Sequence, residues 1–452
     1  MGESVSKQLK LMLSVGALAL VAMVIVACGS SSDSDDSGSD SSTVAGVSAD
    51  TCGEMTYGGE GSPDALIVSD LPLQGDSEDR SKQMNDAITQ VLEGAGWKAG
   101  DTTIGFQACD DSLADTGLWD EQTCKGNANA YSDNSSVIGV VGTYNSGCAQ
   151  VMIPILNQAE NGAVPMVSPG NTAICLTESA NTCTDGAPDS LYPTGDRNYA
   201  RVVPNDAAQG AALATYAADN DLTKVAVLYA ANDDTSSGQA QTFIGAAGPA
   251  GVQIVSQNKW DPEAKNYTDL MNKVKVDNPD AVLLAGLTEQ NGGQLIKDKV
   301  SVLGPNDGAV ALMAPDGFAQ QSTIDEAGKA SAGMIASVPG RVPDLLPGTG
   351  KQFVKELESK TNGQPVELYA PYAGQAAQVL LDAISSAGNE RGAVAAALYG
   401  VKVTDGITGD FAITDTGDPN VSPITINKAA AEFEPVEVIE PKANLVTAAR
   451  GQ

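Results

Sequence analysis

Two short polar segments follow apolar runs of the chain, and each precedes a stretch with a helical pattern. They are Thr143, Asn145 and Ser146 after the run 137–141, and Gly170, Asn171 and Thr172 after the run 164–167. At the start of a helix, free backbone N–H groups and short hydroxyl or amide side chains together bind anions. The two segments therefore predict an anion-binding site. The alternative is that Ser146 and Thr172 only cap their helices, because capping and binding share one geometry.

The residue types that are missing limit the chemistry further. The 452 residues include no histidine, which excludes Ser-His-Asp, Cys-His and histidine–zinc sites. No GxSxG, HExxH or CxxC motif occurs, and no carboxylate spacing marks a hydrolytic pair or a calcium loop. We therefore expect no enzyme, no metal and no cofactor.

The charge balance excludes another class of protein. The chain has 57 Asp and Glu residues against 25 Lys and Arg residues, a formal charge of −32. A nucleic-acid binder needs an excess of cations, so that class is excluded. The acidity fits a salty habitat, simple solubility, or repulsion from anionic lipid, and the sequence does not choose among them.

The N-terminus has the pattern of an export signal. Lys7 and Lys10 precede the apolar stretch 11–27, which is followed by Cys28. The residues Ile-Val-Ala-Cys at its end resemble the lipobox of bacterial lipoproteins, which implies cleavage after residue 27 and lipidation of Cys28. The alternative is a membrane-spanning anchor, and both interpretations place the body outside the cytoplasm. Residues 28–62 are then predicted to be a tether, because 29–42 contain only Gly, Ser and Asp.

Six cysteines remain after Cys28, an even number in an oxidising compartment, which predicts three disulfides. We expect Cys175 to pair with Cys183, because both lie in one polar loop. Cys109 with Cys124 is the next expected pair, which leaves Cys52 with Cys148. Free buried thiols are the alternative for the last pair.

Short apolar runs alternate with helical patterns from residue 63 onward, which indicates an α/β protein with parallel, doubly wound sheets. The runs are 65–68, 103–106, 137–141, 164–167, 225–229, 252–255, 281–285 and 310–313. A single closed barrel is the alternative. Three irregular passages favour two lobes joined by three crossovers: 201–206, 338–343 with two prolines, and 406–419 before a last strand pair, 424–426 and 433–439.

Several stretches together resemble the type I periplasmic-binding-protein fold, and in particular the branched-chain amino-acid (Leu/Ile/Val) binding family of ABC importers. They are VIGVVGTYNSGCA (137–149), VPMVSPGNTA (164–173), RVVPNDAAQG (201–210), VAVLYAANDDTSSGQA (225–240), LMAPDGF (312–318) and GITGDFAITDTGDP (406–419). The resemblance implies two lobes that close on a small molecule. We expect one lobe at 63–203 with 342–407, and the other at 204–341 with 408–445.

The resemblance also implies roles for single residues. Gly170 and Thr172 occupy positions that contact the α-amino and α-carboxylate groups of the ligand, and Asp316 corresponds to the acid that faces the ligand ammonium. Family members commonly carry Tyr where this chain has Ser237, and another ring near 287–288. Without these rings we expect a ligand other than a plain branched-chain amino acid, with hydrogen bonds from Ser237, Thr288 and Glu289. The alternative for Asp316 is an ordinary Asp-Gly turn.

These observations predict an extracytoplasmic lipoprotein that binds an amino acid or a related zwitterion and delivers it to an ABC permease. A sensor that acts on a separate membrane receptor is the main alternative. An extracellular hydrolase is the other, and the missing histidine argues against it. The tryptophans 97, 119 and 260 are expected in the core or at its rim rather than in contact with ligand.

Overall fold

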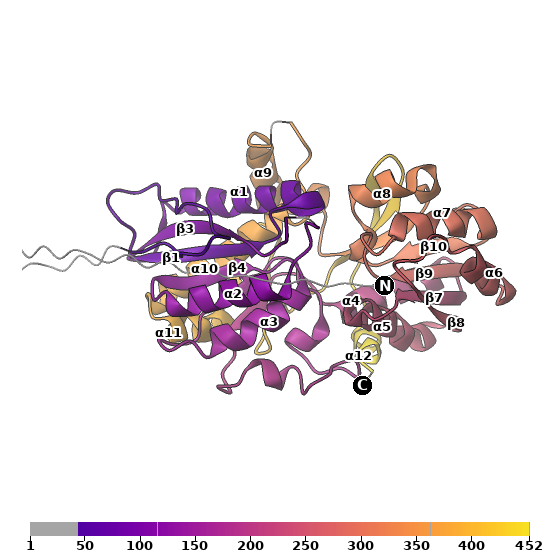
Figure 1. Ribbon diagram of the computed structural model, residues 1–452, viewed down its shortest axis with the longest axis horizontal. Helices are drawn as coiled ribbons and strands as arrows, with labels where there is room; N and C mark the ends of the chain where they lie inside the picture. Colours follow the sequence, from indigo (N-terminus) through magenta and orange to yellow (C-terminus); the bar gives the residue numbers. More distant parts are fainter. Residues whose placement is uncertain (1–43, 115, 362, 452) are drawn as a thin grey trace, which may run out of the picture. The chain divides into compact units, whose positions relative to one another are not determined.

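The computed structural model describes residues 44–114, 116–361 and 363–451, and within them the chain forms two large, separate β-sheets (Figure 1). Both sheets belong to one compact unit, Thr43–Gln452. Two open sheets exclude the single closed barrel and confirm the doubly wound α/β fold.

We call the first sheet and its helices the first lobe. Its strand order is β2-β3-β1-β4-β5-β6, with only β2 and β3 antiparallel. The strands are β1 (Ala65–Leu71), β2 (Lys98–Ala99), β3 (Thr102–Asp110), β4 (Val137–Gly142), β5 (Met166–Ser168) and β6 (Tyr199–Arg201). The helices are α1 (Glu78–Gly94), α2 (Glu121–Asp133), α3 (Ser146–Asn157), α9 (Gly348–Glu358), α10 (Ala370–Ala387) and α11 (Arg391–Ala397).

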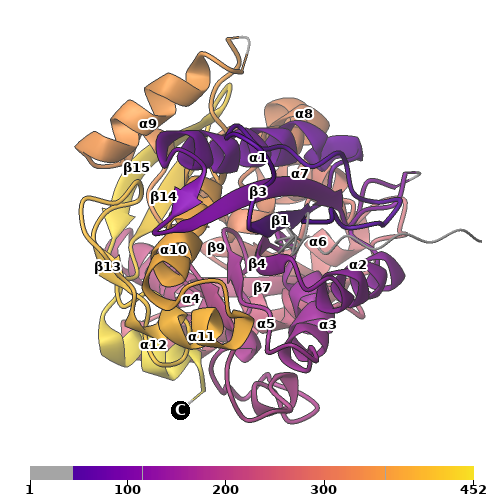
Figure 2. The ribbon, with the colours of Figure 1, turned by 90° about the vertical axis from the view of Figure 1, so that its left-hand side faces the viewer.

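Both faces of this sheet are buried, which explains why its strands are continuous apolar runs. Along β1, Ile67 belongs to the core beneath α1 and α10, whereas the next residue, Val68, belongs to the core beneath α2 and α3. Figure 2 shows α1 on one side of β1 and β3, and α2 and α3 on the other.

The second lobe contains the second sheet, in the order β15-β14-β11-β10-β9-β7-β8. Its strands are β7 (Lys224–Ala230), β8 (Gln253–Trp260), β9 (Ala281–Ala285), β10 (Ala311–Ala314), β11 (Ile335–Pro339), β14 (Ile424–Ala429) and β15 (Phe433–Ile439). Its helices are α4 (Asp206–Asp219), α5 (Asp234–Ala250), α6 (Thr268–Val276), α7 (Gly292–Leu303), α8 (Gln321–Ala327) and α12 (Ala443–Ala449). The sheet is mixed, because β14 pairs antiparallel with both β11 and β15.

The chain passes between the lobes three times, after β6, after β11 and after the short strand β13 (Phe411–Ala412). The first passage ends at Asn205, whose side chain accepts a hydrogen bond from the backbone N–H of Ala207 at 3.1 Å and caps α4. β13 pairs with β12 (Lys402–Val403), and Phe411 and Ile413 lie in a core cluster of the first lobe.

The disulfides correct two of the three expected pairs. Cys175 pairs with Cys183 as expected, but Cys52 pairs with Cys109 and Cys124 pairs with Cys148. Cys52 lies beside the end of β3, where residue 53 donates a backbone hydrogen bond to Ala108. Cys124 and Cys148 lie on the neighbouring helices α2 and α3. The partners are adjacent in space through strand and helix packing, which cysteine spacing does not reveal.

The expected tether is shorter than the sequence suggested. Val47 is buried, its N–H donates to Gln107 Oε1 at 2.8 Å, and its carbonyl accepts from Gln107 Nε2 at 3.1 Å. The chain is therefore packed on β3 from this point onward, well before residue 62. The export signal, Cys28 and residues 29–42 lie outside the described residues.

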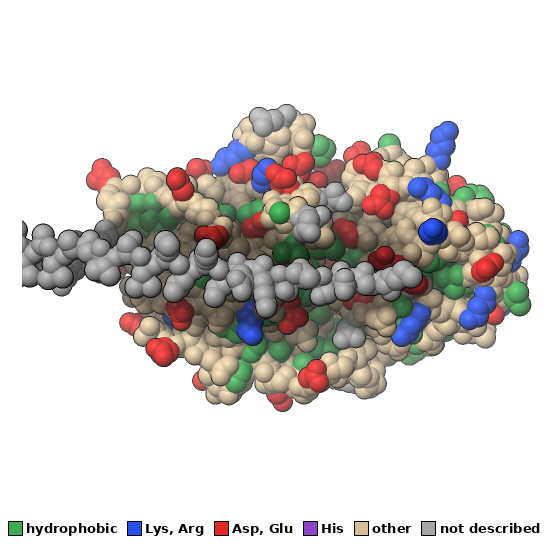
Figure 3. All heavy atoms as spheres, viewed as in Figure 1, with side chains coloured by type: hydrophobic (Ala, Val, Ile, Leu, Met, Phe, Trp, Pro, Cys, Tyr) green, Lys and Arg blue, Asp and Glu red, His purple; other side chains and the backbone are tan. Residues whose placement is uncertain are grey.

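Within the described residues, no helix has both the length and the apolar composition to cross a membrane. On the face shown in Figure 3, Asp and Glu side chains are spread over both lobes and do not form one patch.

Candidate ligand-binding cleft

A cavity of about 370 Å³ is lined by residues from both lobes, and we call it the main cavity. Its lining follows the carboxyl ends of parallel strands, the usual place for a ligand in an open α/β sheet. The lining residues are Ser77, Arg80, Gly117, Leu118, Trp119, Tyr144, Asn145, Ser146, Gly147, Gly170, Thr172, Asp233, Thr235, Gln239, Leu287, Glu289, Gln290, Asp316, Gly317 and Gln320.

Asp316 lies in a short 3-10 turn just after β10, and its carboxylate is held by donors from α4, from α5 and from the residue that precedes α10. Oδ1 accepts from Gln209 Nε2 at 2.9 Å and from Gln239 Nε2 at 3.4 Å, and Oδ2 accepts from Tyr369 OH at 3.0 Å. Burial raises the pKa of Asp316 above its usual value. None of the ion pairs among the described residues includes Asp316, so its charge has no cationic partner there.

Gln239 adds a second acceptor to this part of the cavity. Its side chain is only 6% exposed, and its Oε1 atom has no hydrogen-bond partner. An unpaired buried carbonyl is costly, so the oxygen is suited to accept a hydrogen bond from an N–H group of a ligand.

The N-terminus of α3 supplies donors to the same cavity. Asn145 caps this helix without a side-chain hydrogen bond, the first turn has no acidic residue, and residues 145–147 line the cavity. The free N–H groups and the helix dipole favour an anion at this point. Ser146 Oγ accepts from the N–H of Ala173 at 3.3 Å, so it also joins the two polar segments.

Arg80 places a cation in the cavity that the sequence did not predict. The half-buried guanidinium lies 4.8 Å from the centre of the Tyr144 ring, and its Nη2 donates to Gln320 Oε1 at 2.5 Å. Arg80 belongs to α1 of the first lobe and Gln320 to the second lobe, so this bond joins the lobes across the cavity. No local motif marks Arg80, in the first turn of α1, as a ligand contact.

The aromatic rings come from the first lobe, although the sequence led us to look for them in the second. Tyr144 packs edge-on against Tyr369 with ring centres 5.2 Å apart, and Trp119 lines the cavity. Trp97 and Trp260 are buried and Trp119 packs at the rim of a core cluster, as expected, and Trp119 also lines the main cavity. A Cβ atom at Gly147 would lie 2.3 Å from the Trp119 ring, so glycine is required there.

Six of the ten predicted ligand-binding residues line the main cavity, namely Asn145, Ser146, Gly170, Thr172, Glu289 and Asp316. The other four do not. Thr143, Asn171 and Thr288 are buried and bonded within the protein, to the carbonyl oxygens of Asn145, Tyr144 and Gly317 respectively. Ser237 lies one turn into α5 and its N–H bonds to the carbonyl of Asp233, the residue that caps this helix and lines the cavity instead.

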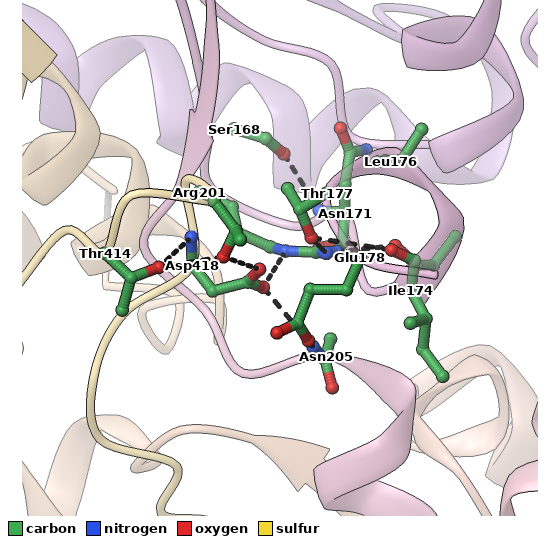
Figure 4. A network of polar contacts seen from close by, with 12 residues as sticks. Ser168, Asn171, Ile174, Leu176, Thr177, Glu178, Arg201, Asn205, Thr414 and Asp418 are labelled. Carbon is green, nitrogen blue, oxygen red and sulfur yellow. Dashed lines mark hydrogen bonds and ion pairs between the residues drawn. The ribbon is translucent and has the colours of Figure 1, made fainter. Parts of the chain in front are cut away.

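A polar network around Arg201 holds the loop that carries the second polar segment (Figure 4). The Nε atom of Arg201 pairs with Asp418 Oδ1 at 2.7 Å. Its Nη1 atom donates hydrogen bonds to the carbonyl oxygens of Asn171 at 3.0 Å and Ala173 at 2.8 Å. The Arg201 side chain is fully buried. This network therefore joins the end of β6, the loop after β5 and the third passage between the lobes.

One group of the described residues has a spacing suited to metal ligands, Asp111 with Cys124 and Cys148. The two sulfur atoms form a disulfide, so they do not offer thiolate ligands.

The fold and this cleft define a binding protein with two lobes, and the comparisons agree. The family model described as "Periplasmic binding protein" matches residues 72–431. Because the match covers most of the chain, the protein belongs to this family, and its fold is the type I fold of the solved structures described next. The family implies a location outside the cytoplasm.

Solved structures show the same fold at low sequence identity. The leucine-binding protein LivK of Thermotoga maritima has a TM-score of 0.70 at 22% identity, over 83% of this chain and 99% of its own. LivJ of Streptococcus pneumoniae, in complex with isoleucine, has a TM-score of 0.68 at 17% identity, over 83% of this chain and 99% of its own. A solute-binding protein of R. palustris, in complex with benzoate, has a TM-score of 0.65 at 18% identity, over 83% of this chain and 96% of its own. Comparison with curated proteins gives no match.

Proposed function

We propose that this protein captures an amino acid or a related small zwitterion between its lobes and delivers it to an ABC importer permease. The lobes are proposed to comprise 63–203 with 342–407, and 204–341 with 408–445, except that residues 411–413 pack with the core of the first lobe. A lipid on Cys28 would keep the body near the permease and raise its effective concentration there.

The observation that carries the proposal is the opposite polarity of two groups in the main cavity. Asp316 offers a carboxylate without a cationic partner among the described residues, and the start of α3 with Arg80 offers donors to an anion. A zwitterion needs both in a site that excludes water, because an unpaired charge is costly to bury. The ligands named for the neighbours, leucine, isoleucine and benzoate, all carry a carboxylate, which supports an anion site.

Bonds between the lobes at the cavity support capture by closure. Arg80 bonds to Gln320, and Tyr369, which directly precedes α10, bonds to Asp316. A ligand that adds contacts to both sides would favour the closed arrangement by its differential affinity.

The test is calorimetric titration of a panel of amino acids, amides and aromatic carboxylates, followed by Asp316→Ala with the best ligand. An unpaired buried ammonium costs about 2 to 5 kcal/mol, so we expect affinity to fall about thirtyfold or more. Asp133→Ala, at an exposed residue of α2, is the control and should bind normally. Unchanged affinity in Asp316→Ala would remove this carboxylate from the site, and hydrolysis of amide or ester substrates would contradict a transport role.

A further inference from the structure

A second, smaller cavity lies beside the main cavity, and we call it the side pocket. It has a volume of about 90 Å³ and shares the lining residues Ser146, Gly147 and Thr235 with the main cavity, so the two spaces are adjacent. Its other lining residues are Gln150, Ala173, Ile174, Cys175, Leu176, Thr182, Thr184, Asp206, Gly238 and Thr242.

The outer wall of the side pocket is the loop closed by the Cys175–Cys183 disulfide. Arg201 holds the base of this loop through the carbonyl of Ala173 and through Thr177 Oγ1 at 2.5 Å (Figure 4). The wall therefore has a defined position beside α5. Ile174, Leu176 and the threonines offer a surface suited to a short methylene chain.

Asp206 is the only ionisable side chain that lines the side pocket, among the described residues, and it is 5% exposed. It begins α4, and its Oδ1 atom accepts from Gln209 Nε2 at 3.3 Å. The same nitrogen donates to Asp316 Oδ1 at 2.9 Å. One amide nitrogen thus lies between two buried carboxylates, Asp316 facing the main cavity and Asp206 facing the side pocket.

The described residues do not neutralise this pair of carboxylates. Asp206, like Asp316, takes part in none of the ion pairs there, and the nearby Arg201 is already paired with Asp418. Burial, and then the charge of Asp316, raise the pKa of Asp206 to about 7. An ordinary neutral amino acid brings one ammonium group and would leave the second carboxylate without a cation.

We propose that the natural ligand is a small diamino acid, with two ammonium groups and one carboxylate, whose second amino group binds Asp206 in the side pocket. This inference rests on the proposed function, because the first amino group is the one that Asp316 receives. The two amino groups must be only a few bonds apart, since both carboxylates contact the same nitrogen of Gln209.

Titration calorimetry with L-ornithine and L-norvaline tests the proposal, because the two differ only by the terminal amino group. A charge pair in a buried site changes affinity strongly, so we expect ornithine to bind about tenfold more tightly or better. In Asp206→Asn this advantage should fall to about twofold or less. Asp382→Asn, at an exposed carboxylate on α10 outside both cavities, should retain it.

Gly238→Leu is the second variant, because a Cβ atom at this helical glycine meets no neighbour and the side chain would fill the side pocket. It should also remove the ornithine advantage while the protein remains folded by circular dichroism. Equal affinities in the unchanged protein, or an advantage that survives both variants, would overturn the diamino-acid proposal and leave amino-acid binding intact. If no α-amino acid binds at all, the proposed function itself fails.

Discussion

Asp111 is predicted to make the first lobe less stable as the pH rises. It follows β3 directly, is fully buried, and neither of its carboxylate oxygens has a hydrogen-bond partner. Asp70, near the end of β1, is also fully buried, and it accepts hydrogen bonds from Asn127 and Tyr131. Burial, and then the nearby Asp70 and Asp110, raise the pKa of Asp111 well above its usual value.

The direction of the effect follows from proton uptake on folding. The raised pKa keeps Asp111 protonated in the folded protein over a pH range above about 4 in which the unfolded chain has already ionised it, so folding binds a proton in that range. The stability is greatest below the unfolded pKa and declines as the pH rises toward the folded pKa. Each pH unit costs about 1.4 kcal/mol, so one such group costs up to about 4 kcal/mol between pH 5 and pH 8. Burial raises the pKa of Asp70 to about 7, which adds to the decline over the lower part of this range.

Asp111→Asn removes this proton uptake, because asparagine is neutral at both pH values. We expect the variant to gain about 2 to 4 kcal/mol relative to the unchanged protein between pH 5 and pH 8, measured by urea unfolding at each pH. Asp133→Asn, an exposed residue at the end of α2, removes the same formal charge and should show no such gain. A variant that follows the pH dependence of the unchanged protein would refute the account of a buried protonated Asp111.

Two further predictions concern the cleft and its support. Arg201→Ala leaves the carboxylate of Asp418 without its partner and should lower the free energy of unfolding by about 3 to 5 kcal/mol, measured by urea unfolding; a loss below about 1 kcal/mol would contradict a structural role for the network. Gly147→Ala places a Cβ atom 2.3 Å from the Trp119 ring and should weaken ligand binding about tenfold by calorimetry. Gly248→Ala on α5, where a Cβ atom meets no neighbour, should bind normally, and equal affinity in both variants would show that Trp119 can move without cost.

The fold could be predicted from the sequence because strands buried on both faces must be apolar throughout. The run 281–285 coincides with β9, and 137–141 with all but the last residue of β4. The sequence predicted β6 and β11 only in part, as extended segments in the passages between the lobes. Short strands that contain polar or proline residues lack the continuous apolar run that marks a buried strand.

The candidate site could be predicted where function follows local backbone geometry. Asn145, Ser146 and Asp316 lie where a strand ends, and the sequence shows such turns directly. Arg80 and Tyr369 could not be found in this way, because Arg80 lies in the first turn of α1 and Tyr369 directly precedes α10, and the local sequence does not show which side chains there face the cavity. The prediction of two disulfide pairs was wrong for a related reason, because Cys124 and Cys148 come together only when α2 packs beside α3.

The sequence by itself determined the alternation of strands and helices, the likeness to its family and the absence of histidine chemistry, because each depends on residue type and order along the chain. Only the tertiary structure decided which charges meet. Asp206 and Asp316 are over a hundred positions apart, yet both contact one nitrogen of Gln209 because α4 and the end of β10 pack at the same edge of the second lobe. A contact of that kind depends on how the elements pack, which the local sequence around either aspartate does not encode.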